Sequence, residues 1–221
     1  MTAYSVVMPA FNTEAYITEA ILSTRAQTVP PREIVVVDDG STDRTAAVVK
    51  SLGADIRLIQ QENRGSGRAT TVAIQAATTA LIAGLDSDDV WLPHKMEQQL
   101  HVLQEMPEIA ACFSRMRQFH DGGDKDAGSG PETDAWIRSS MVMRTEVAVG
   151  VGPVTGQDLI DWLARAREEG HRMHLIDEVL ALRRARPGSL TYDRDGGRNN
   201  AYLLAARQAI LRRRERQPAV E

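Results

Sequence analysis

Apolar and polar positions alternate in blocks along the first hundred residues of the chain. Each short apolar run has the length of a buried strand, and a polar loop follows it. After each loop, apolar residues recur every three to four positions, as in a helix. Strands are expected at 4–8, 33–37, 56–59 and 81–86, and helices at 14–27, 45–52, 68–79 and 93–106. This alternation predicts an α/β fold with a mostly parallel, doubly wound sheet flanked by helices.

Turn residues refine the boundaries of these elements. Pro9 is expected to stop the first strand, since proline offers no ladder donor. Ser41 or Thr42 is expected to cap the helix at 45–52, and Gly53 is expected to end it.

The pattern is less regular after residue 106, and it predicts a mixed second half. The expected elements are strands at 109–119, 136–144, 173–176 and 179–182, and helices at 156–169 and 201–214. The segment 121–134 is rich in Gly, Asp and Ser and nearly lacks apolar residues. We expect a mobile loop there.

The run from Leu81 to Asp89 ends in three carboxylates within four positions, Asp86, Asp88 and Asp89. Unpaired charge cannot follow a buried strand into the core. The strand is therefore expected to end at Asp86 and to present its acids at the carboxyl edge of the sheet, where such sheets bind ligands. Three adjacent like charges need a compensating partner, and a divalent cation carrying a phosphate ester is the candidate. The alternative is an acidic turn that caps the next helix.

Composition and charge limit the classes of function. The chain has 221 residues, 43% of them apolar, and a net charge of −4, which gives no overall attraction to nucleic acid. Its one cysteine, Cys112, lies in an apolar run and is expected in the core. The absence of disulfides fits a reducing compartment, and we expect a cytoplasmic location. No signal segment and no apolar run of membrane-spanning length is found in the sequence.

Four segments together resemble the family-two glycosyltransferases of the GT-A fold. They lie at 5–12, 34–43, 63–65 and 85–95, in the order and spacing of that family. Weaker likeness continues through 156–163 and 183–189, so it covers nearly the whole chain. The resemblance implies a single domain over 1–221, with a nucleotide-sugar-binding half at 1–100 and an acceptor-side half with a C-terminal helix at 101–221. It implies transfer of a sugar from a nucleotide-sugar to an acceptor.

The resemblance also implies roles for individual positions. Asp39 would accept a hydrogen bond from the base of a uridine or thymidine donor. Asp86 would contact the ribose or donor, and Asp88 would bind Mg²⁺ or Mn²⁺. Asp158 matches the catalytic acidic position. The remaining positions expected to border the donor are Pro9, Ala10, Phe11, Asn12, Glu14, Asn63, Gly65, Arg68, Ser87 and Arg186.

The chemistry of sugar transfer agrees with these roles. Negative charge grows on a diphosphate leaving group as the sugar bond breaks, and a metal at Asp88 would stabilise it. The acceptor hydroxyl must lose a proton to a base. Asp158, at the start of the helix expected at 156–169, is assigned as that base, with inversion at the sugar. Asp161, one turn later, is the reserve candidate, and a mere helix cap is the alternative role for Asp158.

Four positions depart from the family pattern. Thr70 and Thr71 stand where the family often has Arg and Asn, and Gln157 stands where it often has Glu. Arg186 matches a late His that often completes the metal site. Arginine cannot ligate a metal but can bind diphosphate, so metal affinity could be weak or Arg186 could replace part of the metal's work.

Other readings remain open at this point. The departures keep alive a catalytically degenerate nucleotide-sugar-binding protein. Trp91 and Trp136 could stack on an acceptor or pack in the core, and His171 with His174 could be a metal pair or unrelated histidines. The arginines at 212–216 could form a solvated helix end or a weak contact with anionic lipid. The acceptor could be a small molecule, a peptide or a lipid-linked precursor.

Overall fold

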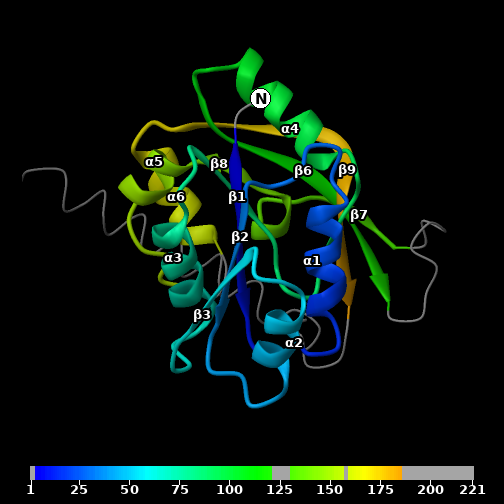
Figure 1. The fold of residues 1–221 in the computed structure, drawn as a ribbon. Coiled ribbons are helices and arrows are strands. Elements are labelled where there is room, and N and C mark those ends of the chain that lie inside the picture. The colour runs from blue at the N-terminus through cyan, green and yellow to red at the C-terminus, as the bar shows by residue number, and fades with distance from the viewer. Residues whose placement is uncertain (1–2, 121–129, 157–158, 186–221) are drawn as a thin grey trace, which may run out of the picture.

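The computed structural model describes residues 3–120, 130–156 and 159–185. Within these residues the strands form one nine-stranded sheet in the order β3-β2-β1-β4-β8-β6-β9-β5, with β7 paired to β6 (Figure 1). The chain is thus a mixed α/β fold. The element order reproduces the alternation expected for the first hundred residues.

The first half of the sheet is parallel. β1 (Tyr4–Ala10) lies between β2 (Glu33–Asp38) and β4 (Leu81–Gly84), and β2 also pairs with β3 (Ile56–Gln60). All seven residues of β1 are buried, which suits a central strand covered on both faces. The predicted parallel sheet is therefore confirmed.

The second half is mixed, as predicted. β8 (Val142–Arg144) runs antiparallel to β4, and β6 (Ile109–His120) runs antiparallel to β8. β9 (Arg172–Ala185) is parallel to β6, and β5 (Val90–Trp91) is antiparallel to β9. β7 (Glu132–Asp134) pairs with the outer end of β6.

Helices cover both faces of the sheet (Figure 1). One core cluster holds residues of α1 (Ile17–Arg25), α2 (Thr45–Ser51) and α4 (Lys95–Glu105). The other holds residues of α3 (Ser66–Ala76), α5 (Thr145–Gly150) and α6 (Ile160–Glu168). Two apolar layers on opposite faces are the mark of a doubly wound sheet.

The first strand continues through Pro9, so the prediction that Pro9 stops it is wrong. The amide of Leu85 donates to the carbonyl of Val7 (3.2 Å), which places Val7 toward β4. Residues two apart face the same neighbour, so Pro9 also faces that side. β4 ends at Gly84, opposite Val7. Proline's missing amide therefore faces a position without a partner strand.

The strand predicted over 136–144 is also wrong in part. Its middle is a short 3-10 turn, η1 (Arg138–Ser140), and only β8 is extended. The Ser140 hydroxyl donates to the carbonyls of Ala135 and Ile137, which draws the backbone into a turn. The turn brings Arg138 and Ser139 beside β4.

Several element boundaries differ from the prediction. The first helix begins at Ile17, because the amides of Thr13 and Glu14 bond to side chains of the 43–45 loop. β4 ends at Gly84, two residues before Asp86. The two short strands expected in 172–185 form one strand, with a register shift where Ile176 and Val179 pair with successive residues of β6. α5 was not predicted.

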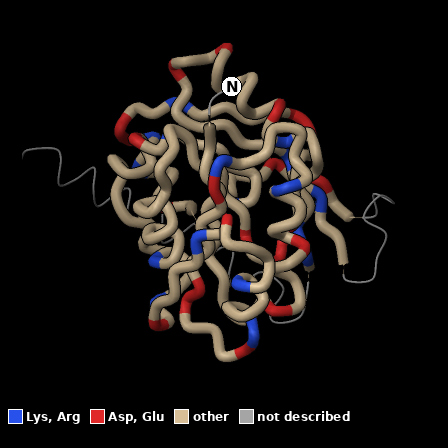
Figure 2. Tube along the Cα trace, in the orientation of Figure 1, with Lys and Arg blue, Asp and Glu red and all other residues tan. Residues whose placement is uncertain are grey.

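Part of the predicted loop 121–134 is extended, since β7 occupies 132–134. The helix predicted at 156–169 begins at Ile160. Residues 121–129, Asp158, Arg186 and the predicted helix at 201–214 with its arginines lie outside the described residues. None of the helices in the described ranges has the length and apolar content that crossing a membrane requires. Acidic and basic positions are interspersed along the described chain (Figure 2).

Candidate functional site

The carboxyl ends of β1, β2 and β4 bring three polar loops to one edge of the sheet. Ala10 and Asp38, the last residues of β1 and β2, pair with each other. The Asp39 amide continues the ladder by donating to the Ala10 carbonyl (2.8 Å). The loops that follow are 11–16, 39–44 and 85–89. This edge is where open α/β sheets bind their ligands.

The first two loops are joined by hydrogen bonds through Asn12. Its amide donates to the Ser41 hydroxyl (3.0 Å), and its side-chain oxygen accepts from the Thr42 amide (2.8 Å). Asn12 has φ +51°, a left-handed conformation that asparagine tolerates better than most residues. Phe11, just before it, is 45% exposed, while Pro9 and Ala10 are buried.

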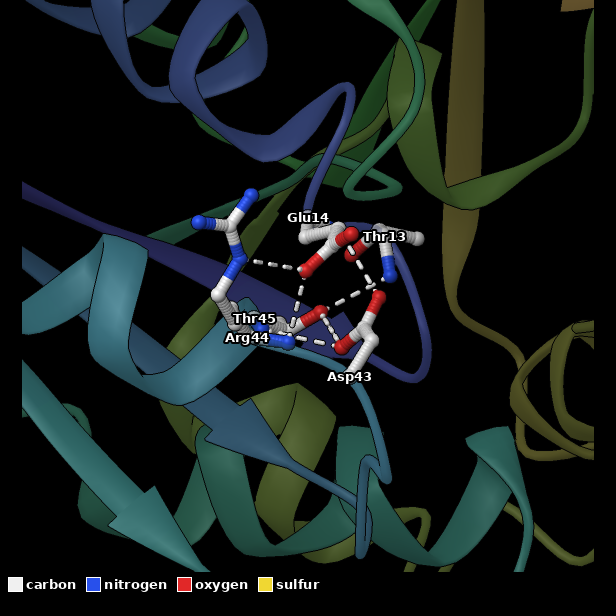
Figure 3. A network of polar contacts seen from close by, with 5 residues as sticks. All are labelled: Thr13, Glu14, Asp43, Arg44 and Thr45. Carbon is white, nitrogen blue, oxygen red and sulfur yellow. Dashed lines mark hydrogen bonds and ion pairs between the residues drawn. The ribbon is translucent and has the colours of Figure 1, made fainter.

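A second network fixes Glu14 and the start of α2 (Figure 3). The Glu14 carboxylate accepts from the Arg44 amide (2.8 Å) and guanidinium (3.3 Å). The Asp43 carboxylate accepts from the Thr45 amide (2.9 Å) and hydroxyl and from the Glu14 amide. Asp43, rather than Ser41 or Thr42, therefore satisfies the start of α2, and the predicted caps are wrong. Ser41 and Thr42 bond to Asn12 instead.

The pKa of Asp43 reflects this network. Partial burial would raise the pKa of this carboxyl group, but the hydrogen bonds from Thr45 and the Glu14 amide outweigh it. The pKa is lowered below its ordinary value. The carboxylate therefore remains ionised and keeps the two loops joined.

Asp39 is buried at the end of β2 and holds the loop before α3. Its carboxylate accepts from the Gln61 side chain (2.6 Å) and from the amides of Arg64 (3.0 Å) and Gly65 (2.8 Å). The neighbouring Gly40 has φ +74°, and a Cβ there would lie 2.7 Å from the Asn63 amide nitrogen. Glycine is therefore required for loop 61–65 to approach this closely.

The predicted site residues Asn63 and Gly65 belong to this loop, whereas Arg68 does not. Asn63 and Arg68 are exposed, and Gly65, at φ +89°, precedes α3. Arg68 lies on α3 itself, in its first turn. Gln61 was not predicted as a site residue, although it lies two positions before the matched segment 63–65.

The turn 86–89 after β4, called the acidic turn below, is fastened at both ends by Ser139. The Asp86 amide donates to the Ser139 hydroxyl oxygen (3.0 Å), and this hydroxyl donates to the Asp89 carboxylate (2.6 Å). The turn is closed by the Asp89 amide, which donates to the Asp86 carbonyl (3.1 Å). Ser139 itself has no exposed surface. The turn is therefore rigidly attached to η1.

Asp86 forms an ion pair with Arg138 of η1. The Arg138 stem crosses β4 at Gly84, where a Cβ would lie 2.6 Å from the arginine Cγ. A side chain at position 84 would displace the arginine. The glycine therefore leaves the space that Arg138 needs to reach Asp86. Neither Arg138 nor Ser139 was predicted, because they stand about fifty positions away in sequence and carry no motif.

Asp89 points into the protein, so the prediction that all three acids face the edge is wrong. It is 3% exposed, and its carboxylate accepts from the Ser139 hydroxyl and from the Arg184 amide (3.0 Å). Burial raises its pKa well above the ordinary value, and the neighbouring acids Asp88 and Asp86 raise it further. Ser87 is also buried. Asp86 and Asp88 are partly exposed.

Arg184 of β9 closes the acidic turn from the other side. Its guanidinium donates to the Asp88 carbonyl (2.9 Å) and to the Glu19 carboxylate of α1. The charged group lies 4.8 Å from the Tyr16 ring centre and 4.6 Å from that of Phe119. Arg184 was not predicted, although it falls in the weakly matching segment 183–189. It joins the end of β9 to the acidic turn and to α1.

The segment 151–156, which leads toward position 158, is attached to α3 and α6. The Val154 amide donates to the Thr71 hydroxyl oxygen (2.9 Å), and a Cβ on Gly67 would lie 2.0 Å from the Gly156 carbonyl oxygen. Arg165 of α6 donates to the carbonyls of Val151 and Pro153. Thr71, which departs from the family pattern, is thus a structural link between α3 and this segment.

Asp161, the reserve base, lies in the first turn of α6 and forms an ion pair with Arg165 (3.3 Å). Asp158 and Gln157 lie outside the described residues, and the helix that was expected to present Asp158 begins only at Ile160. The prediction that both aspartates share one helical face involves Asp158 and therefore lies outside the described residues.

The two tryptophans that could stack on an acceptor, Trp91 and Trp136, have different surroundings. Trp91 is 2% exposed and donates to the Ser139 carbonyl (2.8 Å), so it belongs to the core. Trp136 is partly exposed, and its ring lies 4.9 Å from the Phe113 ring and 4.6 Å from the Arg167 guanidinium carbon. Cys112 is buried, as predicted.

A comparison with known families shows to which family the chain belongs. The family model described as Glycosyl transferase family 2 matches residues 5–153. The chain belongs to glycosyltransferase family 2. The matched range contains all four segments that carry the resemblance, while positions 158 and 186 fall beyond it.

Proteins with similar sequences are also named glycosyltransferases. An uncharacterised glycosyltransferase of Nostoc sp. is 35% identical over 183 residues, which are 79% of this chain and 54% of that protein. The putative glycosyltransferase EpsH of Bacillus subtilis is 33% identical over 124 residues, which are 55% of this chain and 36% of that protein. The chain thus spans about half the length of the Nostoc relative.

Solved structures share the fold of this family member. TarS of S. aureus in complex with UDP-GlcNAc matches with a TM-score of 0.74 and 20% identity, over 95% of this chain and 66% of that chain. TarS in complex with UDP matches with a TM-score of 0.67 and 22% identity, over 84% of this chain and 61% of that chain. These values show a common GT-A-type fold.

The family often employs a divalent cation, so we asked whether the described residues fit one. No group of three His, Cys, Asp or Glu side chains in the described ranges is arranged to hold a metal ion. Asp86 is paired with Arg138, and Asp89 points inward. Asp88 then fits an ion that takes its other ligands from diphosphate and water, as Mg²⁺ usually does. His171 lies 3.7 Å from Glu169 as an ion pair, and His174 lies on β9.

Proposed function

We propose that this chain transfers a sugar from a uridine or thymidine diphosphate sugar to an acceptor hydroxyl, with inversion at the sugar. The observation that carries the proposal is the buried Asp39 carboxylate at the carboxyl edge of the sheet, beside the acidic turn. Both features lie at the edge where open α/β sheets bind ligands, which supports a nucleotide at Asp39 and its diphosphate at the acidic turn. The first hundred residues would bind the donor, and the remainder would bind the acceptor within one domain.

Asp39 is the proposed base-reading residue. An ionised carboxylate offers about four acceptor positions, and loop 61–65 occupies three of them. The remaining position suits an N–H donor such as the imide of uracil or thymine. The exposed Phe11 and the Asn12 loop would lie along the base and ribose, together with Pro9 and Ala10.

Asp88 is the proposed metal-binding residue, supported by its partly exposed position in the acidic turn. A bound Mg²⁺ or Mn²⁺ would offset negative charge on the leaving diphosphate. Arg186, just beyond β9, is proposed as a second cation for the same diphosphate. Glu14, Asn63, Gly65, Arg68, Asp86 and Ser87 are the further residues proposed to border the donor.

Asp158 is the proposed general base for the acceptor hydroxyl. The segment before it is attached to α3 through Thr71 and Gly67 and to α6 through Arg165. These contacts hold the segment 151–156 in place, which supports a fixed position for the residues that follow it. General-base catalysis contributes about 10²–10⁴-fold to the rate.

A thermal-shift screen against UDP, dTDP, GDP and their sugar conjugates tests the donor class. A ligand at about a hundred times its dissociation constant adds roughly 2.7 kcal/mol of stability, so uridine or thymidine compounds should raise the melting temperature and guanosine compounds should not. Hydrolysis of the stabilising nucleotide-sugar, measured with and without Mn²⁺, separates a transferase from a binding protein. Binding without any turnover would overturn the catalytic proposal and leave donor binding intact.

A further inference from the structure

The acidic turn is balanced by groups of the protein itself. Its three carboxylates, at 86, 88 and 89, lead one to expect a divalent cation as the compensating charge. Arg138 instead pairs with Asp86, and the Ser139 hydroxyl and Arg184 amide bond to Asp89. The positive charge and hydrogen bonds that the sequence predicts from a metal are thus supplied in part by η1 and β9.

Arg138 is a fixed positive charge at this position. Its side chain is 6% exposed, against 32% for the Asp86 side chain. Its Nε is buried, with no hydrogen-bond partner among the described residues. A guanidinium stays protonated throughout the physiological range. Arg138 therefore presents its charge from the buried side of Asp86, while the opposite side of that carboxylate faces the exposed edge.

The ion pair between Arg138 and Asp86 affects how a cation can bind to the acidic turn. One oxygen of Asp86 is in contact with the guanidinium, so it is withdrawn as a metal ligand. The positive charge also lies within a few ångströms of any ion bound beside Asp86, where like charges repel. Both effects weaken metal binding without altering Asp88.

We propose that Arg138 is a positioning residue that holds Asp86 in the place of a metal ion and limits how tightly the acidic turn binds divalent cations. The inference rests on the proposed function, in which Asp88 binds a metal together with the donor diphosphate. Metal then binds appreciably only when a diphosphate adds negative charge and ligands of its own.

The test is a Mn²⁺ titration followed by paramagnetic resonance, with and without UDP, on the wild type and on Arg138→Gln. The variant should bind Mn²⁺ about ten-fold more tightly or better in both conditions. Its melting temperature should be lower than that of the wild type without metal and should rise more when Mn²⁺ is added. A purely structural role for Arg138 would lower stability and leave the metal affinity unchanged.

Two controls and a second variant complete the design. Arg144→Gln removes another partly buried arginine, which donates to backbone carbonyls between the end of α4 and the start of β6, and it should leave Mn²⁺ affinity unchanged. Arg138→Lys keeps the charge and should stay within about two-fold of the wild type. Arg138→Met retains much of the stem that crosses Gly84, and it replaces the glutamine variant if that protein does not fold.

The outcomes separate the inference from the proposed function. Equal Mn²⁺ affinity in the wild type and the neutral variants, or the same gain in Arg144→Gln, would overturn the inference. Failure of the wild type to bind UDP in calorimetry would count against the proposed function. The titration without UDP would still decide the role of Arg138.

Discussion

The Asp39 carboxylate receives three hydrogen bonds from loop 61–65, and the proposed donor base would add a fourth. The residue thus has a structural role and a proposed recognition role at once. Substituting it alters both, so a useful test needs a partner variant that alters the loop alone.

We expect Asp39→Ala to weaken UDP or dTDP binding by about 1.5–3 kcal/mol, the usual range for a hydrogen bond to a charged group. Isothermal calorimetry on the folded variant gives this value directly. Gln61→Leu is the matched control, because it removes one loop contact and keeps the carboxylate, and its loss should be smaller. Unchanged affinity in Asp39→Ala would remove the assignment.

Lys95 is the second residue with a measurable signature. It is fully buried, its amine donates to the Gln99 side chain (2.6 Å), and it lies 4.2 Å from the Trp91 ring centre. Burial lowers its pKa to about 7. The nearby Cys112 thiol is neutral between pH 7 and 10, since burial raises its pKa to about 12.

The linkage follows from the direction of the Lys95 shift. Between pH 7 and 10 the unfolded lysine remains protonated, with a pKa of about 10.4, while the native one loses its proton. The unfolded chain then binds more protons, so stability rises with pH in this window, by at most about 1.4 kcal/mol per pH unit. We expect Lys95→Met to abolish this rise in urea unfolding at pH 7, 8 and 9. The exposed Lys50→Met should preserve it, and an unchanged slope in Lys95→Met would contradict the assignment.

At the scale of elements, α3 is joined to the segment 151–156 by a contact that only glycine allows. A Cβ at Gly67 would lie 2.0 Å from the Gly156 carbonyl oxygen and 2.9 Å from that of Val154. Since both obstacles are backbone atoms, the segment rather than a side chain would have to move.

We expect Gly67→Ala to destabilise the protein by about 1–3 kcal/mol, the usual effect of overpacking, and to reduce turnover. Urea denaturation and a donor assay measure the two effects. Gly150→Ala is the control, since its Cβ would meet no neighbour within 4 Å in α5. Its stability should be unchanged or slightly higher, because alanine favours helices. A fully stable and active Gly67→Ala protein would show that the segment tolerates the displacement.

The elements also show what the sequence could predict. The strands of the parallel half are continuous apolar runs, so their existence followed from pattern alone. The turn η1 did not, because the local hydrogen bonds of Ser140 decide it and an apolar count over 136–144 cannot detect them. Asp38, Asp39 and Asp86 were found at the sheet edge as expected. The inward orientation of Asp89 depends on Ser139 and Arg184. Both lie far from Asp89 along the chain, so the local sequence pattern cannot predict these contacts.

At the scale of the whole molecule, the proposed reaction requires the donor half and the acceptor half to meet at position 158. We expect Asp158→Asn to lose about 10²–10⁴-fold in turnover while donor binding stays nearly intact. A coupled assay of UDP release and calorimetry with UDP measure the two quantities.

Asp161→Asn is the matched control for Asp158, and its turnover should change little, since Asp161 pairs with Arg165. If Asp158→Asn kept its turnover and Asp161→Asn lost it, the general base would be Asp161 of α6 instead. Nuclear magnetic resonance of the product should show an inverted anomeric centre, and retention there would exclude this mechanism for either residue.

The bond between the Arg184 amide and the Asp89 carboxylate spans 95 residues of sequence. Contacts at such a separation form late in folding, because a long loop must close first. During synthesis the chain emerges from its N-terminus, so the first hundred residues must wait for β9 before Asp89 gains this partner. A nascent chain that ends before β9 would therefore carry the four segments that match the family, yet its acidic turn would lack this contact. The proposed activity would then begin only after synthesis has passed residue 184.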